Sequence, residues 1–315
     1  MPLDHYVSQV HLRKFYSPKL NNLMYAIRKS DLKEFCCNSQ SVCRIEDGSS
    51  NAYLRKDRLV EDFLQHVEPK YSTSLSKLCN GAIDQECIFA LAGFAAYIMS
   101  CSPASMRVFS DPLKAYVETT AKILDRSGDL PPAPDVLAGK SLTELLEEGT
   151  VHCKIDPKFP QAIGITSIIG WVSVFGNSHW EILRIDEPDA SFFTSDFPVG
   201  IERSIDPRVL NKIVPLAPDL AIRIYPDIRL TGEKPDLSFR RFTAKQRVLR
   251  RQEIIEINRC LVRCAEDMVF FRDNLDWIVP FIARNRHYRI EGVTQRIPNG
   301  TGFLHVSTQR IVSTR

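Results

Sequence analysis

The chain lacks the short motifs that mark the common nucleotide-binding and hydrolytic enzymes. It contains no Gly-x-x-x-x-Gly-Lys-Ser/Thr phosphate loop, no Gly-x-Gly-x-x-Gly turn and no Gly-x-Ser-x-Gly elbow, which disfavours nucleotide hydrolysis and serine-hydrolase chemistry. It also lacks paired Cys-x-x-Cys motifs and a His-Glu-x-x-His helix, so we expect no zinc site. The sequence therefore predicts an activity that needs no metal and no organic cofactor.

Signals for export and membrane insertion are also missing. The first fifteen residues are polar and contain no apolar run of the kind found in signal peptides. The longest apolar run, residues 88–99, is too short to span a bilayer. The nine cysteines are an odd number without the spacing of secreted proteins, which is typical of a reduced chain. These features predict a cytoplasmic protein that is not embedded in a membrane.

The 315 residues are 44% apolar and 25% charged, which gives enough core for one large soluble domain. Helical and alternating apolar spacings predict the secondary structure. The expected helices are 54–67, 75–100, 112–126, 141–148, 160–175 and, as the strongest prediction, 243–274. The expected strands are 23–27, 180–185, 190–194, 214–218, 220–225, 288–293 and 303–312. Ser141 and Glu144 form a capping box at the start of their helix.

This order predicts an α+β fold with a helix-rich N-terminal half, antiparallel strands in mid-chain and a long helix near residues 243–274. Residues 1–315 are expected to form a single large domain, with a possible helical subregion at 54–176 and a strand and long-helix subregion at 178–315. The turn 186–189 is expected to join the strands on either side of it.

Charge is unevenly distributed along the chain. Residues 239–315 contain 15 Lys and Arg against 7 Asp and Glu, although the whole chain has a net charge of only +3. A basic region of this kind favours a surface that binds a polyanion such as DNA. The residues predicted to contact DNA are Arg13, Lys14, Arg250, Arg251, Arg259 and Arg263. The alternative is that the helix arginines form ion pairs with Glu256 or Glu266.

Two short polar motifs lie far apart in the sequence: HYVSQ at residues 5–9 and TSDFPV at residues 194–199. A carboxylate at a strand end beside a sharp turn, such as Asp196, is a common way to hold a catalytic group on a rigid support. If the fold brings the first motif next to Asp196, the two form a compact polar site. The alternative is that Asp196 caps the turn that follows it by binding backbone amides.

The same motifs resemble the hallmarks of a family of proteins of unknown function, HYVPQ near the N-terminus and SDNPV in mid-chain. Ser8 stands in place of the family proline, and Phe197 in place of the family asparagine. Further family-like stretches occur at 215–218 and 256–258, so the resemblance extends from about residue 5 to about residue 275. It implies a role in phage defence, as a DNA glycosylase that removes glucosylated hydroxymethylcytosine and leaves an abasic site.

The predicted substrate-binding residues are His5, Tyr6, Gln9, Ser195 and Asn258. His5, Tyr6 and Gln9 have side chains that donate hydrogen bonds to a base, a sugar or a phosphate, and the ring of Tyr6 is able to stack on a flipped base. The alternative for this segment is an edge strand whose polar residues face solvent. Asn258 is either a core hydrogen-bonding group or a residue of the site.

Asp196 is the predicted catalytic residue. Cleavage of an N-glycosidic bond builds positive charge on the sugar, and a fixed carboxylate stabilises that charge or deprotonates an attacking water. Two rival functions are a defence-associated nuclease, in which His5 and Asp196 bind a metal, and a non-enzymatic nucleic-acid sensor in which both motifs are structural. The expected partner is phage DNA that carries a modified cytosine, although the sensor alternative also leaves a protein as its ligand.

Overall fold

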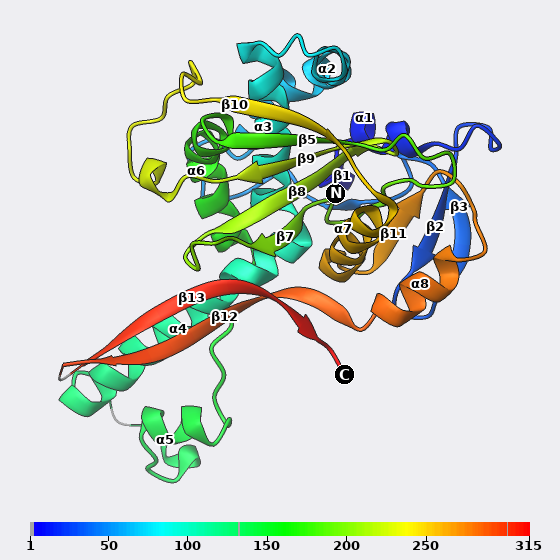
Figure 1. The fold of residues 1–315 in the computed structure, drawn as a ribbon. Coiled ribbons are helices and arrows are strands. Elements are labelled where there is room, and N and C mark those ends of the chain that lie inside the picture. Colours follow the sequence, from blue (N-terminus) through cyan, green and yellow to red (C-terminus); the bar gives the residue numbers. More distant parts are fainter. Residues whose placement is uncertain (1–2, 132, 301) are drawn as a thin grey trace.

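Helix α3 (Gln85–Cys101) passes through the centre of the computed structural model, which describes residues 3–131, 133–300 and 302–315 (Figure 1). The helix begins at Asp84, whose carboxylate accepts a hydrogen bond from the amide of Cys87 at 2.8 Å. Its side chains are nearly all apolar or small, so it is buried on every side. Helices α2 (Leu59–Cys79) and α6 (Lys158–Gly176) pack against it.

Two mixed or antiparallel sheets and two strand pairs complete the fold. The remaining helices are α1 (Gln9–Leu12), α4 (Pro103–Ser127), α5 (Leu142–Glu147), α7 (Arg251–Cys264) and α8 (Ile278–Asn285). The strands are β1 (Leu3–His5), β2 (Met24–Arg28), β3 (Glu34–Cys37), β4 (Arg44–Glu46), β5 (His179–Arg184), β6 (Thr194–Ser195), β7 (Gly200–Arg203), β8 (Leu210–Ala217), β9 (Leu220–Tyr225), β10 (Thr243–Val248), β11 (Met268–Phe271), β12 (Tyr288–Asn299) and β13 (Gly302–Ser313).

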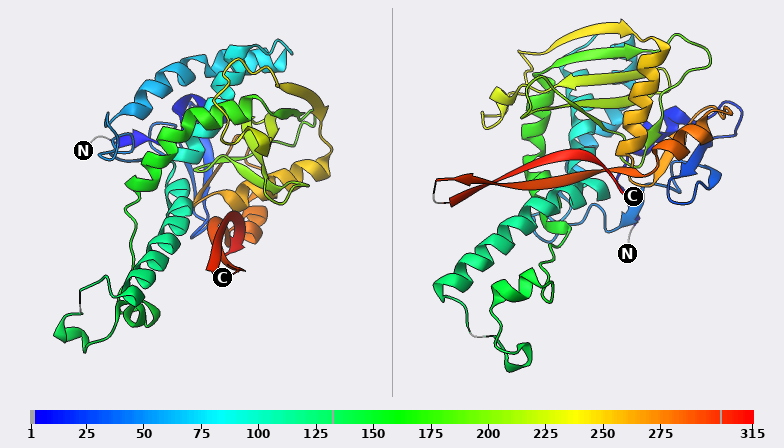
Figure 2. Two further views of the ribbon diagram at one scale, coloured as in Figure 1. Left: turned by 90° about the vertical axis from the view of Figure 1, so that its left-hand side faces the viewer. Right: turned by 60° about the horizontal axis from the view of Figure 1, so that its bottom comes forward.

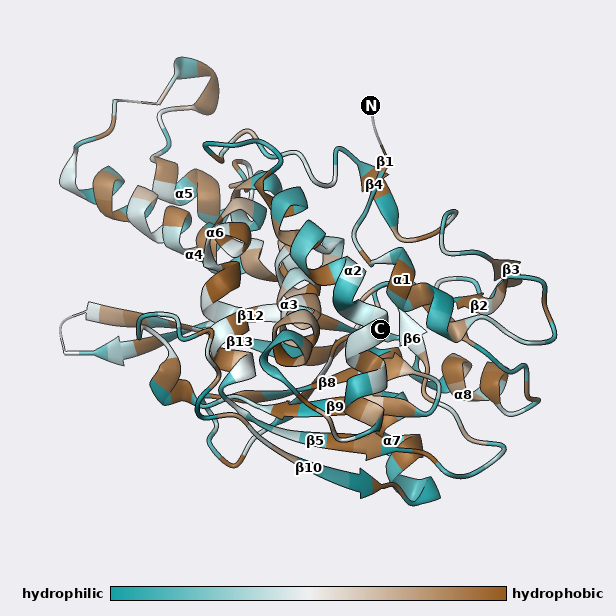
Figure 3. Ribbon diagram, turned by 90° about the horizontal axis from the view of Figure 1, so that it is seen from above, coloured by the Kyte–Doolittle hydropathy of each residue, from teal (hydrophilic) through white to brown (hydrophobic). Residues whose placement is uncertain are grey.

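The larger sheet has five strands in the order β10-β5-β9-β8-β7, and only the β10–β5 pair is parallel. Successive side chains on a strand point to opposite faces, and both faces of this sheet are buried. Ile182 and Ile222 belong to the core around α3 and α6, whereas Leu183 and Ala221 belong to the core under α7. The brown apolar segments on β5, β8 and β9 in Figure 3 reflect this burial on two sides.

The smaller sheet is antiparallel, with the order β3-β2-β11-β6, and its core is shared with α8. Phe193, Phe271 and Phe281 lie in this core, with Trp277 packed at its edge. Strand β11 is central to the sheet, because it pairs with β2 on one side and with β6 on the other. It therefore joins β2, from the N-terminal part of the chain, to the strand that leads into Asp196.

An arm formed by α4 and the β12–β13 hairpin extends away from the two sheets, with α5 near the far end of α4 (Figure 2). Arg107 of α4 donates a hydrogen bond to the carbonyl of Ile290 at 3.0 Å, and Thr294 donates one to Asp111 at 3.0 Å. Gly292 allows the two elements to approach closely, since a Cβ atom at this position would lie 2.3 Å from the carbonyl oxygen of Val108.

The predicted α+β class is confirmed, and so is the capping box at Ser141 and Glu144. The predicted helices 54–67 and 75–100 are instead divided at residues 80–84, because α2 continues to Cys79 and Asp84 starts the next helix. The prediction of one helix over 243–274 is wrong. Residues 243–248 form β10 beside β5, and the chain leaves the helical conformation at Ala265, so α7 occupies only the middle of the segment.

The predicted hairpin of strands 180–185 and 190–194 is also wrong. Strand β5 pairs with β9 and β10, whereas only residues 194–195 of the second segment are a strand, and they pair with β11. Phe192 and Phe193 direct this segment into two different cores, one under α7 and one beside α8. Hydrophobic burial therefore separates two segments that the sequence places next to each other.

Helix α6 is long and apolar enough to cross a membrane by length and composition, and the bent pair of α3 and α4 passes the same test together. Within the described residues, 56% of the apolar window of α6 is buried inside the protein, as in a core helix of a soluble protein. The cytoplasmic location stays a prediction.

Substitution of Gly292 by alanine tests the packing of the arm. We expect Gly292→Ala to lower the free energy of unfolding by about 1–3 kcal/mol, because the added methyl group forces α4 and β12 apart. The matched control is Gly302→Ala on β13, where the atom nearest to a Cβ lies at 3.8 Å. Denaturant unfolding of both variants measures the difference, and equal stabilities would contradict the close approach.

Candidate nucleic-acid site

The carboxylate of Asp196 is fully occupied by the backbone that follows α7. Its Oδ1 accepts a hydrogen bond from the amide of Glu266 at 2.9 Å, and its Oδ2 accepts from the amides of Asp267 and Met268, each at 2.8 Å. The amide of Asp196 donates in return to the carbonyl of Met268 at 3.1 Å. Asp196 thus ends the helix and starts β11, and it binds amides far along the chain rather than the turn at Pro198.

Burial is the main influence on the charge of Asp196. It raises the pKa of the carboxyl group to about 6, although the three amide hydrogen bonds and the ammonium of Lys29 act in the opposite direction. Lys29 is itself buried and donates from Nζ to the carbonyls of Ala265 and Tyr288, at 2.6 and 2.8 Å. The carboxylate is therefore enclosed by protein groups on the side of α7 and β11.

The first motif does lie beside the second, but the region between them is packed core. His11, just beyond the motif, is fully buried and bridges the two regions: its Nδ1 is 2.8 Å from the hydroxyl of Tyr71, and its Nε2 is 2.7 Å from the hydroxyl of Thr194. Burial, with the nearby charges of Cys43 and Asp196, raises the pKa of the Tyr6 phenol well above its usual range.

The other predicted residues of the two motifs differ in how their polar groups are used. The backbone carbonyl of His5 accepts a hydrogen bond from the hydroxyl of Tyr97 at 2.7 Å, whereas Nε2 of its imidazole has no partner among the described residues. Gln9 accepts from Arg13 and Ser39, at 3.2 and 3.3 Å. The hydroxyl of Ser195 accepts from the amide of Phe197 at 3.1 Å, and both residues are buried. The structure thus brings the motifs together as a packed unit, and their roles in substrate binding stay predictions.

A cavity of about 630 Å³ lies on the other side of α7, between this helix, α8 and the loop before β6. Its volume falls within the range of roughly 300–1,000 Å³ that is typical of small-ligand sites. The residues that line it include four arginines, one aspartate and two aromatic side chains: Arg251, Arg259, Arg263, Arg284, Asp189, Trp277 and Phe281. We refer to it as the arginine cavity. It is strongly cationic, because a single carboxylate opposes four guanidinium groups.

The four arginines differ in how firmly they are held. Arg263 donates from Nε to Asn285 at 2.8 Å, and its guanidinium lies 4.2 Å from the centre of the Tyr288 ring. Arg259 forms an ion pair with Glu256. Among the described residues, no carboxylate lies within 4.0 Å of the guanidinium group of Arg251 or Arg284, and both side chains are exposed. Two cations of the cavity are therefore available to an anionic ligand.

Asn258 lines the arginine cavity, but its amide group is used inside the protein. Its Oδ1 accepts a hydrogen bond from the amide of Phe193 at 3.0 Å, and its Nδ2 donates to the carbonyl of Ser191 at 2.8 Å. Asn258 is thus a hydrogen-bonding group of the core that also lies in the cavity wall, and its role in substrate binding stays a prediction. It holds the loop that forms one wall of the cavity.

The predicted DNA-binding residues fall into two groups. Arg251, Arg259 and Arg263 meet at the cavity, whereas Arg250 caps α7 outside it and Arg13 and Lys14 lie on the short helix after α1. Sequence reasoning missed Asp189, Trp277, Phe281 and Arg284. The segment 277–285 carries a signal for three of them, since its aromatic and arginine residues recur at helical spacing.

The side chains that are able to bind a metal ion test the alternative of a metal-dependent nuclease. The described part of the chain contains no group of three His, Cys, Asp or Glu side chains arranged to hold a metal ion. In addition, Asp196 already accepts three amide hydrogen bonds. The residues present do not fit a metal shared by His5 and Asp196.

The fold and cavity define an α+β protein with a cationic, aromatic-lined site beside α7 and α8. A family model described as "Protein of unknown function (DUF4238)" matches residues 4–274, so the chain belongs to this family. No curated protein and no solved structure matches the chain. The resemblance noted from the two motifs is thereby confirmed at the level of the family, while its glycosylase activity stays a prediction.

Replacement of the Asp196 carboxylate by an amide tests its role at the end of α7. We expect Asp196→Asn to lower the free energy of unfolding by about 2–3 kcal/mol, because the new NH₂ group faces amide donors and leaves them unpaired. Asp267→Asn is the matched control, since its Oδ1 accepts a hydrogen bond from the amide of Ser30 and an oxygen acceptor remains after the change. An Asp196→Asn protein as stable as the parent would contradict this role.

Proposed function

We propose that the protein binds nucleic acid at the arginine cavity and hydrolyses the N-glycosidic bond of a modified cytosine there, leaving an abasic site. The observation that carries the proposal is the gathering of four arginines and a half-buried tryptophan around one cavity. Guanidinium groups bind phosphate oxygens in pairs, and aromatic rings provide platforms on which unpaired bases stack.

Trp277 is the proposed stacking platform. Its indole packs on Phe193 at a centroid distance of 5.7 Å and a small interplanar angle of 25°, and its edge meets Phe281. These two phenylalanines hold the indole in place, which keeps the entropy cost of stacking low. A base flipped out of the duplex would enter between this ring and the arginines. The volume of the cavity suits a cytosine that carries an additional sugar.

The chemistry requires a carboxylate near the sugar. Asp189 supplies the carboxylate that lines the arginine cavity, and it is exposed, unlike Asp196. We assign it the role of stabilising positive charge at the sugar carbon while water attacks and the base leaves. Asp196 then acts as a positioning residue, since it holds the end of α7, which carries three of the cavity arginines.

The modified cytosine itself is the finer part of the proposal and rests on the resemblance of the HYVSQ and SDFPV motifs. A non-enzymatic nucleic-acid sensor is the second candidate. It is favoured by the burial of Tyr6, Ser195 and Asp196 and by the use of the Ser195 hydroxyl and the Asp196 carboxylate within the protein. The two functions share the cavity and differ in whether a base is released.

Removal of the cavity arginines tests DNA binding. We expect the triple variant Arg251→Gln, Arg259→Gln, Arg284→Gln to bind duplex DNA at least tenfold more weakly at low salt, with the slope of log affinity against log salt reduced by about two to three. Arg263 is left intact because it packs on Tyr288. The matched control changes three exposed arginines outside the cavity: Arg240, Arg241 and Arg310. Fluorescence anisotropy at two salt concentrations gives the result, and equal weakening of both triples would remove the cavity from the binding surface.

Base release tests the reaction. The protein is incubated with a duplex that contains glucosylated 5-hydroxymethylcytosine, and the free base is measured by mass spectrometry. We expect release by the parent and a loss of at least about a hundredfold in Asp189→Asn. Asp186→Asn, an exposed change in the same loop but outside the cavity, is expected to keep activity. If the parent binds this DNA and releases no base, the sensor is the better description.

A further inference from the structure

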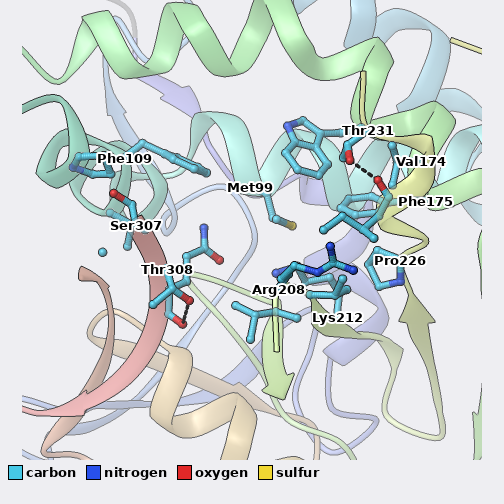
Figure 4. A pocket seen from close by; sticks show the side chains of 18 of the residues that line it. Met99, Phe109, Val174, Phe175, Arg208, Lys212, Pro226, Thr231, Ser307 and Thr308 are labelled. Carbon is cyan, nitrogen blue, oxygen red and sulfur yellow. Dashed lines mark hydrogen bonds between the residues drawn. The ribbon is translucent and has the colours of Figure 1, made fainter. Parts of the chain in front are cut away.

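A second cavity, of about 340 Å³, lies between the larger sheet, helices α4 and α6, and the β12–β13 hairpin (Figure 4). Most of its wall is apolar, with Met99, Phe109, Trp171 and Phe175 among the lining residues. Figure 4 shows Lys212 and Arg208 together on one side of this space. We refer to it as the lysine cavity. It is separate from the arginine cavity, with which it shares no lining residue.

Lys212 is the unusual member of this wall. It lies on β8, between β7 and β9, opposite Ile201 on one side and Ile224 on the other, and only 6% of its surface is exposed. Among the described residues, its ammonium group donates no hydrogen bond and has no carboxylate within 4.0 Å. The ionisable groups that influence it are the thiols of Cys260 and Cys264 on α7.

An ammonium group in such a place is costly. Removing a charge from water without a partner is unfavourable by several kcal/mol, and most buried lysines therefore have an acceptor, as Lys29 has in this protein. Burial lowers the pKa of Lys212 to about 8, so the group is still mostly charged at neutral pH. Lys212 thus presents to the cavity a cation that has no partner of opposite charge among the described residues, on a side chain that is otherwise buried.

We propose that the lysine cavity binds a small aromatic carboxylate, whose anionic group pairs with the ammonium of Lys212 while its ring packs against Trp171 and Phe175. The apolar wall is complementary to the ring of the ligand, and the unpaired ammonium is complementary to its negative charge. Arg208 is a second cation of the wall, but it is largely exposed and its guanidinium group already holds Asp206 through three hydrogen bonds. Asp227 is the carboxylate among the lining residues, and it is bound by Arg229. Lys212 is therefore the group that selects a negatively charged ligand.

The test compares two ligands of the same shape. Isothermal titration calorimetry measures binding of 2-naphthoate and of its neutral isostere 2-naphthamide to the full chain. We expect the carboxylate to bind at least tenfold more tightly than the amide. Lys212→Met, which keeps the length of the side chain and removes the charge, is expected to abolish this preference. Arg208→Met serves as the matched control and is expected to keep it.

A second measurement does not depend on the choice of ligand. Because Lys212→Met removes an unpaired buried charge, we expect it to raise the Tm of the ligand-free protein by about 3 °C. The proposal is overturned if naphthoate and naphthamide bind the parent equally well, if neither binds, or if Arg208→Met rather than Lys212→Met removes the preference. None of these results bears on DNA binding or base release, which concern the arginine cavity.

Discussion

The hydrogen bonds of the buried Asp196 carboxylate are the constraint on which the rest of the structure depends. They end α7 at Cys264 and place the next residues in β11, which stands between β2 and β6 in the smaller sheet. Because a buried carboxylate without partners is far more costly than one with three amide donors, the alternative arrangements of this segment are disfavoured. The position of α7, and with it the arginine cavity, follows from this one contact.

Both cavities contain cations whose removal from water costs free energy, but the surroundings of these cations differ. In the arginine cavity the cations lie at the rim, and water or neighbouring groups such as Glu256 and Tyr288 moderate their charge. In the lysine cavity the side chain that carries the cation is buried in the wall, and among the described residues no carboxylate pairs with its ammonium group. The charges of the cavity arginines are thus stabilised by many groups, whereas the charge of Lys212 is left for a ligand to stabilise. A polymer with many phosphates suits the first site, and a single small anion suits the second.

Much of the fold could be predicted from the sequence, and the reasons for the errors are physical. The apolar periods of α3, α6 and α7 identified these helices, because burial requires those periods. The segment 243–274 was wrongly predicted to be one helix, since the interactions that end the helix on either side come from β5 and Asp196, both distant in sequence. Three cavity arginines were found because they share one helix. Asp189 was missed because no local pattern joins its loop to α7. Trp277 and Arg284 stand at helical spacing, but the sequence does not show that their segment faces α7.

The central place of β11 has a consequence for synthesis of the protein. Lys29 and Ala265, which contact each other, are 236 positions apart, and β2 has only the short β3 as a nearby partner. A growing chain must therefore carry an unfinished sheet edge and an unfilled core until nearly all of it has emerged from the ribosome. Such long-range closure slows folding and leaves apolar surface open to other chains. Production of this protein in cells is thus expected to depend on chaperones more than its size alone would indicate.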